Sequence, residues 1–150
     1  MELLSRIADA QKEAMKARDT ARLSTVRMIL AAVKDKEIAL RTSGQEMSEG
    51  EVLALLGKMV KQRQESAKVY VDGGRQELAD KELAEVGVIE TFLPKALSAA
   101  EVEAAIGAAI AEAGATSLRD MGKVMGVLKA KYTGQMDFGA VGAVLKSRLG

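Results

Sequence analysis

The residues best suited to chemistry lie between Ser117 and Gly150, where glycines recur together with lysines and arginines. This stretch holds six cations and two aspartates, although the whole chain has a net charge of only +1. Cationic side chains bind phosphates, and glycine, which has no side chain, lets another backbone approach closely. The pattern therefore predicts a surface for an anionic partner, with RNA as the first candidate.

Helical periodicity separates these residues from the apolar ones. At about 100° per residue, the apolar residues of each predicted helix share one face. The predicted apolar stripes are Leu118, Met121, Met125, Leu128 and Tyr132, then Phe138, Val141, Val144, Leu145 and Leu149. The predicted RNA- or partner-binding residues lie off these stripes and are Arg119, Gly122, Lys123, Gly126, Lys129, Gly139, Gly142 and Lys146.

The glycines have two interpretations. A glycine inside a helix costs about 0.5–1 kcal/mol relative to alanine, so a function should offset this loss of stability. In the alternative interpretation, the glycine faces pack against another helix of the same chain and the cations are ordinary solvated charge.

Most catalytic chemistry is excluded by composition. The chain has no cysteine and no histidine, so thiolate nucleophiles, the commonest general base and zinc sites are absent. No serine lies in a recognisable nucleophile motif, and no glycine-rich phosphate loop follows a strand. Acidic pairs such as Asp80 and Glu82 are two residues apart and face different ways on a helix. We expect no catalytic residue, no metal and no cofactor.

The same composition predicts an all-α fold, because alanine and leucine are frequent and aromatic residues make up only 3%. The only proline, Pro94, marks a boundary. We predict an N-terminal four-helix antiparallel assembly at 1–93, a linker at 94–97 and a three-helix tail at 98–150. The N-terminus does not resemble a signal peptide and no apolar run reaches about 20 residues, which predicts a cytoplasmic protein without a membrane span.

A second group of charged residues flanks the Gly73-Gly74 pair. Several neighbouring charges of both signs usually satisfy one another, so they predict a network that joins the third helix to the fourth. A ligand or partner surface is the alternative. The residues of this predicted network are Lys61, Arg63, Glu65, Arg75, Glu77, Lys81 and Glu82.

Two separated stretches resemble a known family. DMGKVMGVLKAKYTGQMDFGAVGAVLKSRL is similar to the C-terminal signature shared by the YqeY family of small bacterial proteins and the tail of GatB, a component of the tRNA-dependent amidotransferase. KQRQESAKVYVDGGRQELADKELAEVGVIETFLP also resembles the YqeY signature. The resemblance covers only the helical and tail regions that follow the catalytic domain of GatB, and it implies contact with the body of tRNA.

We therefore expect a non-catalytic, amidotransferase-related module that binds tRNA or another structured RNA through its tail. The alternative is a protein-interaction module whose glycine faces receive a helix from a translation-related protein. A stand-alone carbon–nitrogen ligase with glutamine as amide donor is the least favoured hypothesis, because the chain lacks the catalytic parts of the enzyme it resembles.

Overall fold

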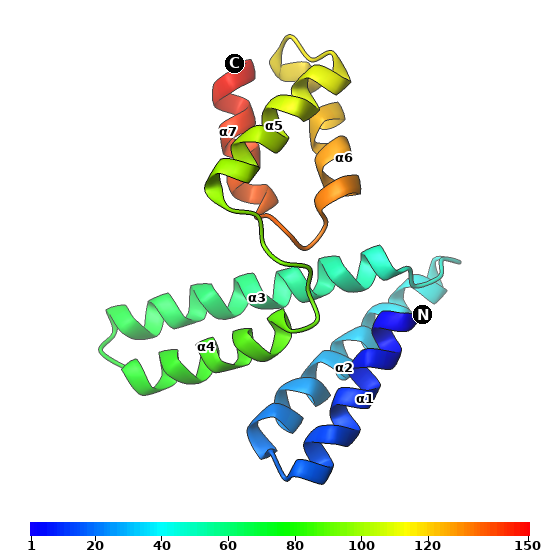
Figure 1. Ribbon diagram of the computed structural model, residues 1–150, viewed down its shortest axis with the longest axis vertical. Coiled ribbons are helices and arrows are strands. Elements are labelled where there is room, and N and C mark those ends of the chain that lie inside the picture. Colours follow the sequence, from blue (N-terminus) through cyan, green and yellow to red (C-terminus); the bar gives the residue numbers. More distant parts are fainter. The chain divides into compact units, whose positions relative to one another are not determined.

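The computed structural model describes all residues from Met1 to Gly150 and contains helices and turns but no strand (Figure 1). The predicted all-α fold is confirmed. The helices are α1 (Glu2–Ala17), α2 (Thr20–Thr42), α3 (Glu49–Asp72), α4 (Gln76–Glu90), α5 (Ala99–Ala113), the 3₁₀ turn η1 (Leu118–Asp120), α6 (Met121–Tyr132) and α7 (Phe138–Leu149). None of them combines the length and the apolar character that a membrane crossing requires.

The chain forms two compact units, Met1–Leu93 and Pro94–Gly150. Unit 1 consists of two antiparallel hairpins, α1–α2 and α3–α4 (Figure 1). The first hairpin turns at Arg18, whose φ of 55° is left-handed, and the Asp19 side chain then caps α2 by accepting from the backbone N–H of Arg22 at 3.1 Å. The second turns at Gly74, where a φ of +73° favours glycine.

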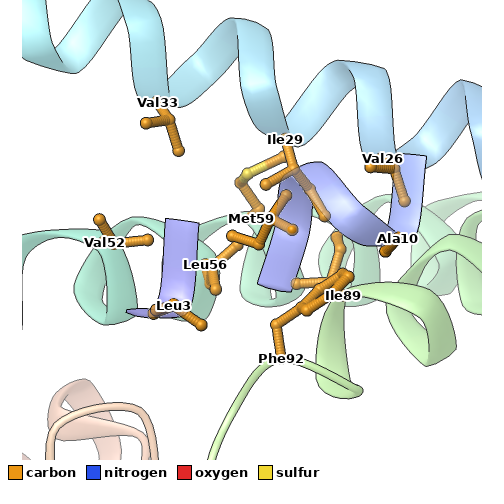
Figure 2. Close-up of a cluster of buried hydrophobic side chains, with 11 residues drawn as sticks. Leu3, Ala10, Val26, Ile29, Val33, Val52, Leu56, Met59, Ile89 and Phe92 are labelled. Atoms are coloured by element: carbon orange, nitrogen blue, oxygen red, sulfur yellow. The ribbon is translucent and has the colours of Figure 1, made fainter. Parts of the chain in front are cut away.

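One core joins the two hairpins of unit 1 (Figure 2). Its buried members are Leu3, Ile7, Ala10, Val26, Ile29, Val33, Val52, Leu56, Met59, Ile89 and Phe92. Each fully buried leucine or isoleucine among them stabilises the fold by about 1.5–3 kcal/mol relative to exposure. On α3 and α4 these residues lie only at the start of α3 and around the end of α4. The hairpins therefore cross, with α1–α2 over one half of α3–α4, instead of lining up as four antiparallel helices (Figure 1).

The other half of the α3–α4 hairpin packs through small residues. Ala67 and Ala79 are 4% and 0% exposed, whereas Leu83 is 47% exposed. Leu83 therefore lies on the solvent side of α4 although it is a large apolar residue. Alanine lets two helices approach closely, and this approach fixes the α4 face that meets α3.

Unit 2 packs α5, α6 and α7 around a core of its own. Its buried members are Ala105, Ile106, Ala109, Val124, Leu128, Val141 and Leu145. Leu118 is 42% exposed and Val124 is fully buried, so the predicted stripe of the sixth helix is partly wrong. The cause is the 3₁₀ turn over Leu118–Asp120, because its 3.0 residues per turn rotate Leu118 out of phase with α6.

The predicted linker at 94–97 is held against a loop of unit 2. The backbone N–H of Leu97 donates to the carbonyl oxygen of Gln135 at 2.9 Å, and Nε2 of Gln135 donates to the carbonyl oxygen of Lys95 at 3.2 Å. This segment therefore makes hydrogen bonds as part of unit 2.

Candidate functional site

The predicted binding residues of the sixth helix form one exposed row. Arg119 lies in η1, and Gly122, Lys123, Gly126 and Lys129 follow on α6, all exposed. Gly122 and Lys123 are consecutive, and the other successive members are three residues apart, so all five lie on one broad face of the helix over roughly 15 Å. We call these five residues the α6 row.

The start of the α6 row is fixed by Asp120. Its carboxylate accepts from the backbone N–H of Thr116 at 3.0 Å and of Ser117 at 3.3 Å. The hydrogen bond from Thr116 has the largest effect in lowering the pKa of Asp120 below its ordinary value, and the bond from Ser117 has the next largest. The positive charges of Lys123 and Arg119 lower this pKa further. An ionised carboxylate thus lies between two cations of the row and weakens the positive potential at this end.

A capping box at Ser117 is only half formed. The carboxylate of Asp120 accepts a hydrogen bond from the backbone N–H of Ser117, but Oγ of Ser117 is buried and has no hydrogen-bond partner. The complete capping box of unit 2 is at α5, where Ser98 and Glu101 bond each other's backbone N–H.

The glycines of α6 and α7 differ in their surroundings. A Cβ added at Gly122 or Gly126 meets nothing within 4 Å, so the backbone there is open. At Gly142 the added atom lies 3.4 Å from Cε of Met121, which places α6 itself over this glycine. Gly142 is therefore half-buried within unit 2, contrary to the outward face predicted for it. Gly139 is exposed in the first turn of α7 and donates its N–H to Asp137 at 2.9 Å.

The six cations between Arg119 and Arg148, in η1, α6 and α7, fall into two groups. Lys131 forms an ion pair with Glu112 at 2.7 Å, which raises the pKa of Lys131, and Arg148 forms one with Glu103. The other four, which are the predicted binding cations Arg119, Lys123, Lys129 and Lys146, make no ion pair. Lys146 lies on α7 and makes no hydrogen bond or ion pair with the α6 row.

The charged group predicted in unit 1 forms one interhelical link. Arg63 on α3 donates to Glu85 on α4 at 2.9 Å, and Glu85 was not among the predicted residues. Arg75 pairs with Glu77 at 3.1 Å, but both are exposed and lie at the start of α4. Three other residues of the predicted group form no ion pair, namely Glu65, Lys81 and Glu82. Lys61 is exposed on α3. Of the predicted network, the structure thus shows the Arg75–Glu77 pair and a link from Arg63 to a glutamate outside the predicted group.

Comparison with known proteins gives a family. A family model described as Yqey-like protein matches residues 4–149. The fungal protein named "Altered inheritance of mitochondria protein 41, mitochondrial" is similar to this chain in several species. The identity is 32% over 92 residues in Lachancea thermotolerans, covering 61% of this chain and 48% of that protein. It is 38% over 82 residues in Meyerozyma guilliermondii, covering 55% and 41%.

The chain spans about half the length of the curated relatives it matches. The protein of that name from Saccharomyces cerevisiae strain YJM789, for example, is 29% identical over 92 residues, covering 61% of this chain and 49% of its own length. These names place the relatives in mitochondria, and this finding overturns the cytoplasmic location predicted from the sequence.

Proposed function

The chain belongs to the family of YqeY-like proteins, and from this premise we propose that it is a non-catalytic module, related to the amidotransferase component GatB, that binds tRNA or another structured RNA through unit 2. The observation that carries the proposal is the division of the six cations of η1, α6 and α7. The two that pair with glutamates fix one helix to another, and the four that pair with nothing are the predicted binding residues. Unpaired exposed cations remain available for phosphates.

The α6 row fits a phosphate backbone better than it fits bases. Its side chains are cationic or absent, and no aromatic residue in the row offers a stacking surface. The open backbone at Gly122 and Gly126 allows close approach of a sugar-phosphate strand. Recognition would therefore depend on RNA shape and on charge, with little preference for sequence.

Binding of this kind has a defined salt dependence. Each phosphate neutralised makes the slope of log K against log salt more negative by about 0.7–0.9, so a site with four cations reaches a slope of about −3.6 at most. Asp120, between Arg119 and Lys123, reduces this contribution at one end of the row. We expect modest affinity that falls steeply with salt.

The test is a tRNA titration at two salt concentrations with the wild type and the variant Lys123→Glu/Lys129→Glu/Lys146→Glu. Because the relatives are named as mitochondrial proteins, both bacterial and mitochondrial tRNA are used. The matched control is Lys34→Glu/Lys58→Glu/Lys68→Glu, which changes the net charge equally at exposed positions of unit 1. We expect the unit 2 variant to lose binding and the control to keep most of it. Equal binding by both variants, or no binding by the wild type at low salt, contradicts the proposal.

A second candidate function is docking of a partner's helix against the α6 row. It is favoured by the open space above Gly122 and Gly126, which are one helical turn apart. Gly126→Leu should block such a helix but leave the cations in place. Loss of a translation-related protein from nuclease-treated pulldowns, with tRNA binding retained, would support this function, and an unchanged pulldown would count against it.

A further inference from the structure

The sulfur of Met28 in unit 1 accepts a hydrogen bond from a charged donor. Met28 lies on α2, and its Sδ accepts from Nη2 of Arg63 on α3 at 3.7 Å. Of the eight methionines in the chain, only Met28 has a hydrogen bond to its sulfur. A thioether is a weak acceptor, whereas a guanidinium is a strong donor that bonds best to oxygen. The contact therefore joins a strong donor to a poorly matched acceptor.

Two other hydrogen bonds fix the direction of this donor. Nε of Arg63 donates to Glu85 at 2.9 Å, and Nη1 donates to the carbonyl oxygen of Met59 at 3.3 Å. A guanidinium is planar and rigid, so these bonds also set where Nη2 points. The Arg63 side chain is only 15% exposed, which leaves water little access to it. Nη2 is thus held toward the sulfur of Met28.

Small solutes can reach Met28 from solvent. Its side chain is half-buried and lines a shallow hollow on α2. The other lining residues of the hollow are Thr20, Leu23, Ser24, Arg27 and Ala31. Met59, by contrast, is 6% exposed and belongs to the core of unit 1. Met28 therefore combines access from solvent with a fixed donor.

The separation of sulfur and nitrogen suits an added oxygen. An oxygen bonded to Sδ at about 1.5 Å lies about 2.8 Å from Nη2 when the S–O···N angle is about 115°, with both heavy atoms kept at their separation of 3.7 Å. Such a distance is that of a charge-assisted hydrogen bond. A sulfoxide at Met28 would therefore give Arg63 the strong acceptor that the thioether does not provide.

We propose that Met28 is a site of reversible oxidation by hydrogen peroxide and that Arg63 directs the oxygen to one side of the sulfur. A lone pair of Sδ attacks one peroxide oxygen, and an S–O bond forms as the O–O bond breaks. The proton of the transferred oxygen goes to the departing hydroxide, which leaves as water. The thioether loses two electrons, and the peroxide gains them. A sulfoxide reductase with a dithiol reverses the step by returning two electrons and releasing the oxygen as water.

The fixed donor gives this site a stereochemical signature. Negative charge develops on the oxygen that is transferred, and Nη2 stabilises this charge on one side of the sulfur only. A sulfoxide sulfur is chiral, so attack at that side produces one epimer. Solvent exposure alone has no such preference. The inference concerns unit 1 and does not depend on RNA binding.

The test treats the full chain with limiting hydrogen peroxide and maps each methionine by mass spectrometry. Two methionines without a sulfur hydrogen bond are internal references, Met15, which is 53% exposed, and Met125, which is half-buried on α6. The epimers are assigned on the digested peptides with the two sulfoxide reductases, each of which reduces one epimer. We expect Met28 to give one epimer in about fivefold excess or more, and both references to give about equal amounts.

The variant Arg63→Leu/Glu85→Leu removes the donor together with its counterion, so no unpaired buried charge remains. We expect it to bring the epimer ratio at Met28 to about one. If this variant does not fold, Arg63→Lys is used, because it keeps the charge beside Glu85 but lacks the rigid fork, and the same loss of preference is expected. The matched control, Arg75→Leu/Glu77→Leu, removes an exposed pair and should leave the ratio unchanged.

Three outcomes would overturn the inference. The first is a Met28 that stays unoxidised under conditions that oxidise Met125. The second is equal amounts of both epimers at Met28 in the wild type. The third is an excess of one epimer that persists after the guanidinium is removed, because the preference would then come from another part of the site.

Discussion

Nε of Arg63 on α3 donates to Oε2 of Glu85 on α4 at 2.9 Å, with side chains only 15% and 16% exposed. The same guanidinium donates to the carbonyl oxygen of Met59 at 3.3 Å and to Sδ of Met28 on α2 at 3.7 Å. One side chain therefore contacts both hairpins of unit 1, at the place where their shared core ends. Its charge is tolerated there because a carboxylate accompanies it.

Glu85→Gln should lower the free energy of unfolding by about 2–3 kcal/mol, because it leaves the Arg63 charge largely buried without a counterion. The matched control is Glu77→Gln, which breaks the exposed pair with Arg75 and should cost less than about 1 kcal/mol. Urea unfolding of both variants measures the difference. Equal losses would show that burial does not decide the strength of the Arg63–Glu85 pair.

The sequence identified Arg63 as part of a charged group but missed its partner. A hairpin that turns at Gly74 brings together residues equally far from the turn, and Arg63 and Glu85 are each eleven residues from it. Neighbouring charges along the chain suggested a network at the turn, where solvent competes for every pair. The missing information was the hairpin register, which depends on small residues such as Ala67 and Ala79.

In unit 2, the helices, the cap at Ser98 and the exposure of the α6 row were predictable because they depend on local sequence. The exposure of Leu118 and the packing of Met121 over Gly142 were not. The first depends on a 3₁₀ turn that shifts the helical phase by part of a turn. The second depends on the position of Met121 on another helix. Periodicity within one helix contains neither piece of information.

Two serines that look alike in sequence should respond oppositely to alanine. Oγ of Ser98 accepts from the backbone N–H of Glu101 at 3.2 Å, so Ser98→Ala should cost about 1 kcal/mol of stability. Oγ of Ser117 is buried without a partner, so Ser117→Ala should be neutral or stabilising. Thermal unfolding of the two variants measures this contrast. A comparable loss in both would mean that Ser117 caps η1 in solution.

Asp120 should make unit 2 sensitive to acid. Backbone hydrogen bonds from Thr116 and Ser117 lower its pKa in the folded chain below the ordinary value of 3.8. A lowered folded pKa gives stability that is fully present above the unfolded pKa and is lost as the pH falls through the folded one. Asp120→Asn should therefore be less stable than the wild type near neutral pH, and the gap should close in strongly acidic solution. Denaturation at a series of pH values, with Asp35→Asn as control for lost charge, tests this sign.

The two units should fold separately. Each has its own buried cluster, and Pro94 follows immediately after the last residue of unit 1. Fragments 1–93 and 94–150 should each give a helical circular dichroism spectrum and a cooperative melt. The cut is placed before Pro94 because the backbone of Leu97 bonds to Gln135 in unit 2. An unfolded fragment that becomes helical only when the other is added would contradict independent folding.

The open glycines of α6 give a direct comparison of stability with function. Gly122→Ala and Gly126→Ala each add a methyl group that meets nothing within 4 Å, so each should stabilise unit 2 by about 0.5–1 kcal/mol through helix propensity. Gly142→Leu is the contrasting variant and should destabilise unit 2, because Met121 already lies 3.4 Å from the added carbon.

If the α6 row is a binding surface, Gly122→Leu and Gly126→Leu should weaken tRNA or helix binding while the fold is retained, since they cover the exposed backbone. If both leucine variants stay folded and bind as the wild type does, close approach to these glycines plays no part in recognition.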